Sequence, residues 1–77
     1  MNKERRQAIA EVKTKLGELR LRVEELREEQ DAYVDNMPRG FLQSDRGMAA
    51  EVAAGCLWAA HDAIEEAIKE LEEAVSI

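Results

Sequence analysis

One stretch decides the fold: residues 9–33, with the sequence IAEVKTKLGELRLRVEELREEQDAY. Large side chains recur in it at alternating steps of three and four residues, which is the spacing of a seam along one face of a helix. The members of the repeat are Ile9, Val12, Leu16, Leu19, Val23, Leu26, Gln30 and Tyr33. With Ile9 as heptad position a, the predicted seam occupies positions a and d, and the polar Gln30 is typical of a residue that sets register.

The same repeat returns after a break that contains the only proline. Residues 57–75 carry it at Leu57, His61, Ile64, Ile68, Leu71 and Val75. The break itself, residues 36–40, holds Asn36, Pro38 and Gly40, which suit a turn and interrupt a helix. We therefore predict an all-α, antiparallel two-helix hairpin, with helices over about 3–35 and 45–74, a turn over about 36–44, and Ser44 or Asp45 as the second N-cap.

The charge distribution supports the antiparallel arrangement. Residues 3–22 contain seven basic and three acidic residues, whereas residues 45–77 contain two basic and eight acidic ones. Basic residues near a helix N-terminus and acidic residues near a C-terminus oppose the helix dipole, and an antiparallel partner of opposite charge offsets the conflict. At position e we expect Lys13, Arg20 and Arg27 to lie along Glu72, Glu65 and Glu51.

A second apolar surface on the second helix predicts self-association. A chain of 77 residues is one small domain, and two helices alone bury only one stripe each. Position g of the second helix is alanine four times, at Ala53, Ala60, Ala67 and Ala74, and further apolar residues lie beyond the seam. We predict a four-helix bundle, with a homodimer favoured. The predicted interface consists of Val52, Ala53, Cys56, Trp58, Ala59, Ala60, Ala63 and Ala67.

Composition excludes several classes of partner. A net charge of −6 disfavours direct binding to nucleic acid or to anionic lipid, because both require positive charge. No apolar run approaches the ~20 residues that span a bilayer. The single cysteine, Cys56, forms no disulfide within the chain. We expect a cytoplasmic protein.

No catalytic, cofactor or metal site is predicted. His61 and Glu65 could supply two metal ligands from one chain, which is too few. Cys56 and His61 are five residues apart at different angles on the helix, so they do not form a nucleophile and base. His61 is instead expected to pack opposite Leu19. The chain is therefore predicted not to be an enzyme.

The hairpin tip is the remaining candidate site. Tyr33, Arg39 and Arg46 lie near it in sequence, with the apolar pair Phe41 and Leu42. In a symmetric oligomer such a tip could hold a small anion, and a solvated turn is the alternative.

Four segments carry a resemblance to a known group: MNKERR at residues 1–6, DNMP at 35–38, LQSDRG at 42–47 and AIEEAI at 63–68. Together they resemble a widespread group of small uncharacterised proteins of bacteriophages and prophages. The resemblance implies phage origin and the cytoplasm of a bacterial host, and it implies no activity. The sequence departs from the group at Arg39, Gly40 and Phe41.

These observations lead to one expected function and two alternatives. We expect a non-enzymatic interaction protein that binds and modulates a host or phage protein, such as a counter-defence inhibitor. Its expected contacts are Phe41, Leu42, Trp58, Glu65 and Glu72. The alternatives are an oligomer that sequesters an anionic nucleotide through Tyr33, Arg39 and Arg46, and a structural assembly factor.

Overall fold

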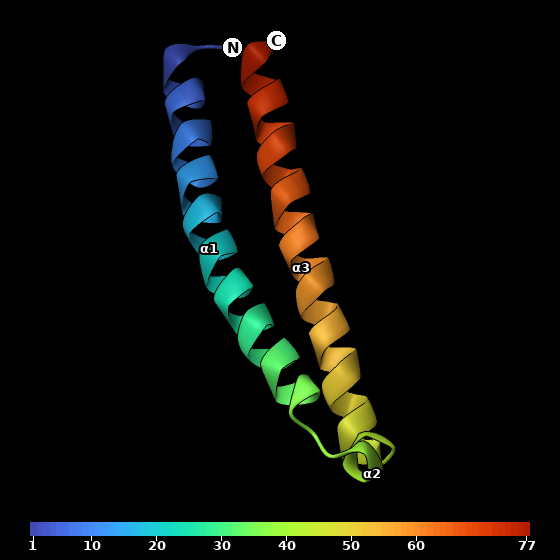
Figure 1. The fold of residues 1–77 in the computed structure, drawn as a ribbon. Coiled ribbons are helices and arrows are strands. Elements are labelled where there is room, and N and C mark those ends of the chain that lie inside the picture. Colours follow the sequence, from blue (N-terminus) through green and yellow to red (C-terminus); the bar gives the residue numbers. More distant parts are fainter.

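The protein is a rod of two long antiparallel helices joined by a short one (Figure 1). The computed structural model describes residues 1–77. Helix α1 spans Lys3–Asp35, α2 spans Arg39–Leu42 and α3 spans Asp45–Ser76. The rod measures 58 × 16 × 13 Å, with both termini at one end and α2 at the other. The predicted all-α hairpin is confirmed, and its assembly into a four-helix bundle stays a prediction.

Side-chain caps fix where both long helices begin. Asn2 precedes α1, and its Oδ1 accepts a hydrogen bond from the backbone N of Arg5 at 2.8 Å. Ser44 precedes α3, and its Oγ accepts one from the backbone N of Gly47 at 3.2 Å. Asparagine and serine satisfy the first free N–H groups of a helix better than apolar residues do. Ser44 is therefore the N-cap, as predicted, and α3 continues to Ser76.

The turn contains a helix of its own. The backbone N–H of Asn36 donates the last i→i−4 bond of α1 to the carbonyl of Ala32, and Pro38 has no N–H with which to continue the helix. The carbonyl of Pro38 then accepts bonds from the backbone N of Phe41 and Leu42, which closes the single turn α2. This turn packs against the start of α3. The segment predicted as an irregular turn is thus partly helical.

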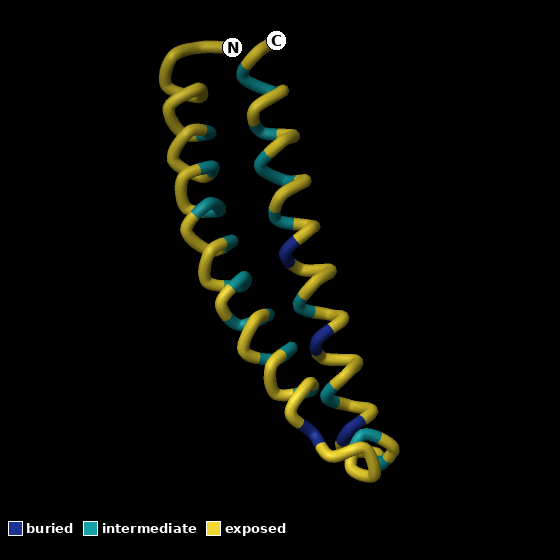
Figure 2. Tube along the Cα trace, in the orientation of Figure 1, coloured by how far each residue is buried: buried dark blue, intermediate teal, exposed yellow.

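The core of the hairpin is thin. Only Met37, Gly47, Ala54 and His61 are buried, and no large side chain is fully enclosed. Figure 2 shows most of the buried and half-buried segments along the facing sides of the two long helices and in the turn, and exposed segments over the outer sides. The seam of α3 follows positions a and d as predicted: half-buried are Ala50, Leu57, Ile64, Ile68, Leu71 and Val75.

Helix α1 is rotated relative to the prediction. Its half-buried residues occupy positions a, b and e, with Leu26 the one half-buried residue at position d. The other members of position d, Val12, Leu19 and Tyr33, are 49%, 56% and 52% exposed. The prediction that position d of this helix faces α3 is wrong for these three. Long basic side chains occupy position e, and their methylene stems cover apolar surface while their charged ends reach polar partners.

Candidate interaction surface

One long face of the hairpin, the polar face, carries the contacts between positions e and b of α1 and positions e and a of α3. Near the termini, Lys13 Nζ lies 3.3 Å from Glu72 Oε1, which confirms that predicted pair. Both side chains are about half exposed, so the pair contributes only ~0–1 kcal/mol and acts mainly on register. The side chain of Arg6 reaches the backbone carbonyl of Val75 and ties the open end of the rod.

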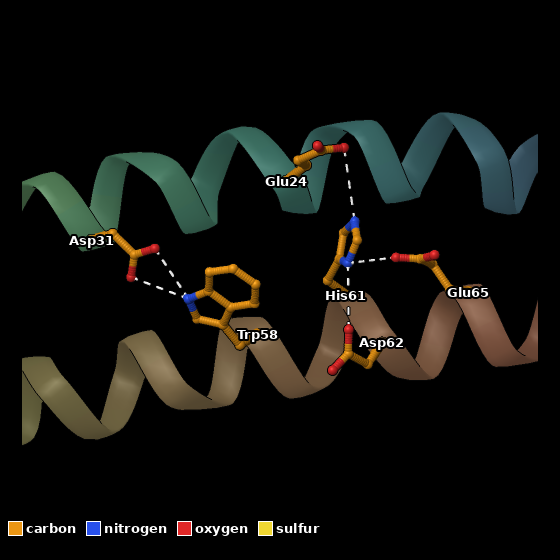
Figure 3. Close-up of polar contacts among 6 residues, drawn as sticks. All are labelled: Glu24, Asp31, Trp58, His61, Asp62 and Glu65. Carbon is orange, nitrogen blue, oxygen red and sulfur yellow. Dashed lines mark hydrogen bonds and ion pairs between the residues drawn. The ribbon is translucent and has the colours of Figure 1, made fainter.

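Trp58 is the centre of a second polar-face contact (Figure 3). Its Nε1 donates to Asp31, at 3.0 Å from Oδ2 and 3.3 Å from Oδ1. The guanidinium of Arg27 stacks on the indole, with Cζ 3.7 Å from the ring centroid. Arg27 therefore pairs with an aromatic ring, and the prediction that it meets Glu51 is wrong. Trp58, predicted in the oligomer interface, makes these contacts within the hairpin and remains 46% exposed, so its place in an interface stays a prediction.

Arg20 was predicted to meet Glu65. It makes no ion pair and instead lines an open, polar hollow on α3 together with Glu65 and Glu72. Its charge thus contributes to the acidic side of α3 without a fixed partner.

Replacing Arg27 by alanine is expected to loosen Trp58. An exposed cation–π contact contributes ~0.5–1 kcal/mol, and the Arg27 stem also covers the ring, so we expect a loss of that size in the free energy of unfolding. Trp58 is the only tryptophan, so its fluorescence should become more accessible to acrylamide quenching.

Arg22→Ala is the matched control for this change, because Arg22 pairs only with Glu25 one turn away on the same helix. We expect the control to leave quenching unchanged. Equal quenching in both variants would contradict the stacked geometry.

His61 is buried among three carboxylates on the polar face (Figure 3). Its Nδ1 lies 3.0 Å from Glu65 Oε1 and 3.7 Å from Asp62 Oδ1, and its Nε2 lies 3.8 Å from Glu24 Oε2. Nδ1 has no hydrogen-bond partner, although both Glu65 and Asp62 lie near it. The residue is buried as expected, but it faces Glu24 of α1, and the prediction that it packs opposite Leu19 is wrong.

The same cluster offers the chain's one set of possible cation ligands. Ligand atoms of His61, Asp62 and Glu65 lie within 4.8 Å of one another, and both carboxylates are exposed. Asp62 was not predicted as a member of this cluster, because adjacent residues on a helix normally point in different directions.

The opposite face of the hairpin, the apolar face, combines residues from both long helices. Since positions e and b of α1 point to the polar face, position d points to the opposite one. Positions e and g of a helix flank the a/d seam on opposite sides. Since position e of α3 points to the polar face, its position g points to the opposite face. The apolar face therefore brings together two columns. We name the large residues of α1 the ridge: Val12, Leu19, Leu26 and Tyr33. We name the small residues of α3 the alanine shelf: Ala53, Ala60, Ala67 and Ala74.

The ridge and the shelf are matched residue by residue along the rod. The contacts of Lys13 with Glu72 and of Arg27 with Trp58 fix the register of the two antiparallel helices. Both helices rise equally per residue, and both columns repeat every seven residues. Each large residue therefore lies beside an alanine at the same level. The matched pairs are Val12 with Ala74, Leu19 with Ala67, Leu26 with Ala60, and Tyr33 with Ala53.

The residues predicted for the oligomer interface all lie on α3, at four different heptad positions, and their place in an interface stays a prediction. Ala53, Ala60 and Ala67 belong to the shelf. Cys56 and Ala63 border the shelf on the outer side of α3, Val52 and Ala59 lie on the back of α3, and Trp58 lies on the polar face. All except Ala67 are exposed.

The heptad spacing of the ridge residues predicts a place in the hairpin seam, and their exposure on the apolar face follows only from the structure. One signal could have revealed the rotation of α1. Position e carries Lys13, Arg20 and Arg27 but ends in the apolar Val34, which indicates that this column points inward.

Of the predicted tip residues, Arg39, Phe41 and Leu42 lie on α2, Tyr33 lies in the last turn of α1 and Arg46 lies in the first turn of α3. Phe41 is 39% exposed, Leu42 is half-buried, and Arg39 and Arg46 are exposed. Neither surface hollow includes any of them or Tyr33. The nucleotide-binding alternative therefore stays a prediction without an enclosed site in the single hairpin.

Comparison with known proteins gives no match to any family model, curated protein or solved structure. No helix is both long and apolar enough to cross a membrane.

Proposed function

We propose that this chain is a non-enzymatic interaction protein whose hairpin completes its core by associating with a second copy, and whose remaining surface binds a protein partner. The observation that carries the proposal is the thin core, combined with the ridge, of which the hairpin leaves Val12, Leu19 and Tyr33 about half exposed and Leu26 half-buried. Monomeric soluble proteins rarely leave such surface in a continuous patch.

The energetics favour covering the ridge. Burying the remaining half of a valine, leucine or tyrosine side chain contributes on the order of 1 kcal/mol. A symmetric pair of hairpins covers two ridges, and the alanines of the shelf allow the partner's backbone to approach closely. A lone hairpin of this length lacks that contribution and is marginal for its size.

The outer surface suggests the chemistry of a further partner. The net charge is −6, and the exposed carboxylates Glu66 and Glu73 lie on the back of α3, away from the hairpin seam. Such a surface fits a basic protein surface and is attracted to it over a range that shortens as salt increases. A host or phage protein with a basic groove is the partner that we propose.

The mass in solution tests the self-association. Light scattering across micromolar concentrations is expected to give twice the 8.7 kDa of the chain, with a melting temperature that rises with concentration. A mass of 8.7 kDa at every concentration would refute it.

Binding of a basic partner to the carboxylates of α3 is tested by reversing their charge. Glu66→Lys combined with Glu73→Lys should release a partner that the wild-type protein captures from bacterial lysate, while the mass stays that of a dimer. A captured protein that the double variant retains equally would contradict the acidic contact.

A further inference from the structure

We propose that the second copy docks on the apolar face with its twofold axis parallel to the helices, so that the ridge of each chain lies on the alanine shelf of the other. This inference rests on the proposed self-association and specifies its geometry. The occupant of the apolar face is therefore another copy of this chain.

Shape selects this arrangement over the other twofold packing of the same faces. A twofold axis parallel to the helices places α1 of one chain over α3 of its partner and keeps each residue at its own level. Leu19 then meets the partner's Ala67, and Leu26 meets the partner's Ala60. A twofold axis perpendicular to the helices would place ridge on ridge and shelf on shelf, which crowds large side chains in one half of the interface and leaves voids in the other.

Charge selects the same arrangement. Residues 3–22 carry a net charge of +4 on α1, and the second half of α3 is acidic. The parallel axis sets the basic half of α1 against the acidic half of the partner's α3 at the same level. The perpendicular axis would set the acidic half of α3 against the first half of the partner's α3, where Arg46 is the only basic residue.

The area of the face is sufficient. The rod is 58 Å long and up to 16 Å wide, so one face covers on the order of 900 Å². Stable dimers bury ~800 Å² per partner. In the resulting bundle every neighbouring helix is antiparallel, and both hairpin tips project from the same end.

Disulfide cross-linking between single-cysteine chains tests the geometry. In a Cys56→Ser background, one chain carries Leu19→Cys and a second carries Ala67→Cys. On mild oxidation the mixture is expected to form a covalent dimer, and neither chain alone is expected to do so. Leu26→Cys with Ala60→Cys is a second pair at another level, which covers the case in which one substitution disturbs folding. Leu21→Cys mixed with Ala67→Cys is the control, because Leu21 is 57% exposed but lies outside the ridge.

The remaining outcomes contradict either the parallel twofold axis or the self-association itself. Cross-linking of Leu19→Cys with itself, or with Leu26→Cys, would show α1 packed on α1 and overturn the parallel axis. A dimeric mass with no cross-link from either matched pair would also overturn it, while leaving self-association in place. A monomeric mass would refute the self-association itself.

Discussion

Leu19→Glu is expected to dissociate the dimer, and Leu21→Glu is expected to leave it intact. The two leucines are 56% and 57% exposed in the hairpin, so exposure alone predicts equal effects. They differ in position: Leu19 lies on the ridge, whereas Leu21 lies on the outer side of α1. A dimer contains two copies of the substituted ridge residue. Losing about 1 kcal/mol of burial at each weakens association roughly thirty-fold, and the cost of desolvating two carboxylates weakens it further.

The measurement is the mass by light scattering, together with the concentration dependence of the melting temperature. For Leu19→Glu we expect a mass of one chain and a melting temperature independent of concentration, because only an associating protein gains stability by mass action. Ala60→Glu on the alanine shelf should give the same result from the other helix. Equal dissociation by Leu21→Glu would show that the copies meet on a different face.

Gly47→Ala is expected to destabilise the hairpin by about 2–3 kcal/mol. A methyl group at Gly47 would enter the backbone of the turn, meeting the carbonyl of Phe41 and lying 2.6 Å from Leu42 Cα. Backbone atoms cannot rotate aside as a side chain can, so α2 must move away from α3 or α3 must lose its first turn. Forced overpacking of this kind costs ~1–3 kcal/mol, and it lies next to the Ser44 cap.

Gly17→Ala and Gly55→Ala are the matched controls. Both glycines lie inside helices, and an added methyl group meets no atom within 4 Å at either site. Each control should raise the free energy of unfolding by ~0.5–1 kcal/mol, because alanine favours the helix over glycine by that amount. For a domain of this size, thermal unfolding should place Gly47→Ala roughly 10–20 °C below the wild type and both controls above it. A melting temperature of Gly47→Ala equal to that of the wild type would contradict the close packing of α2.

The fold was predictable because its determinants are local. Heptad spacing, the break at Pro38 and the cap at Ser44 all act within a few residues, and they define the two helices and their antiparallel order. The pair of Lys13 with Glu72 also followed from charge and register alone.

The rotation of α1 was not predictable by the same route. Positions d and e flank position a on either side, and both can face a neighbouring helix. Whether position d or position e faces α3 depends on which residues of α3 the long side chains at position e can contact. Arg27 finds the indole of Trp58, a contact between residues 31 positions apart that no local pattern encodes. The cluster around His61 likewise needs Glu24 from the other helix.

The sequence separation of the contacts increases from the turn towards the termini, and this increase implies an order of folding. The segment from Asn36 to Ser44 closes with backbone bonds between residues three or four apart, Trp58 meets Asp31 across 27 positions, and Arg6 meets Val75 across 69. The entropy lost on closing a loop increases with the number of residues enclosed. We therefore expect pairing of the two long helices to begin next to α2 and to proceed towards the termini. The termini should pair last and separate first, so that amide hydrogens near Lys3 and Ser76 exchange fastest.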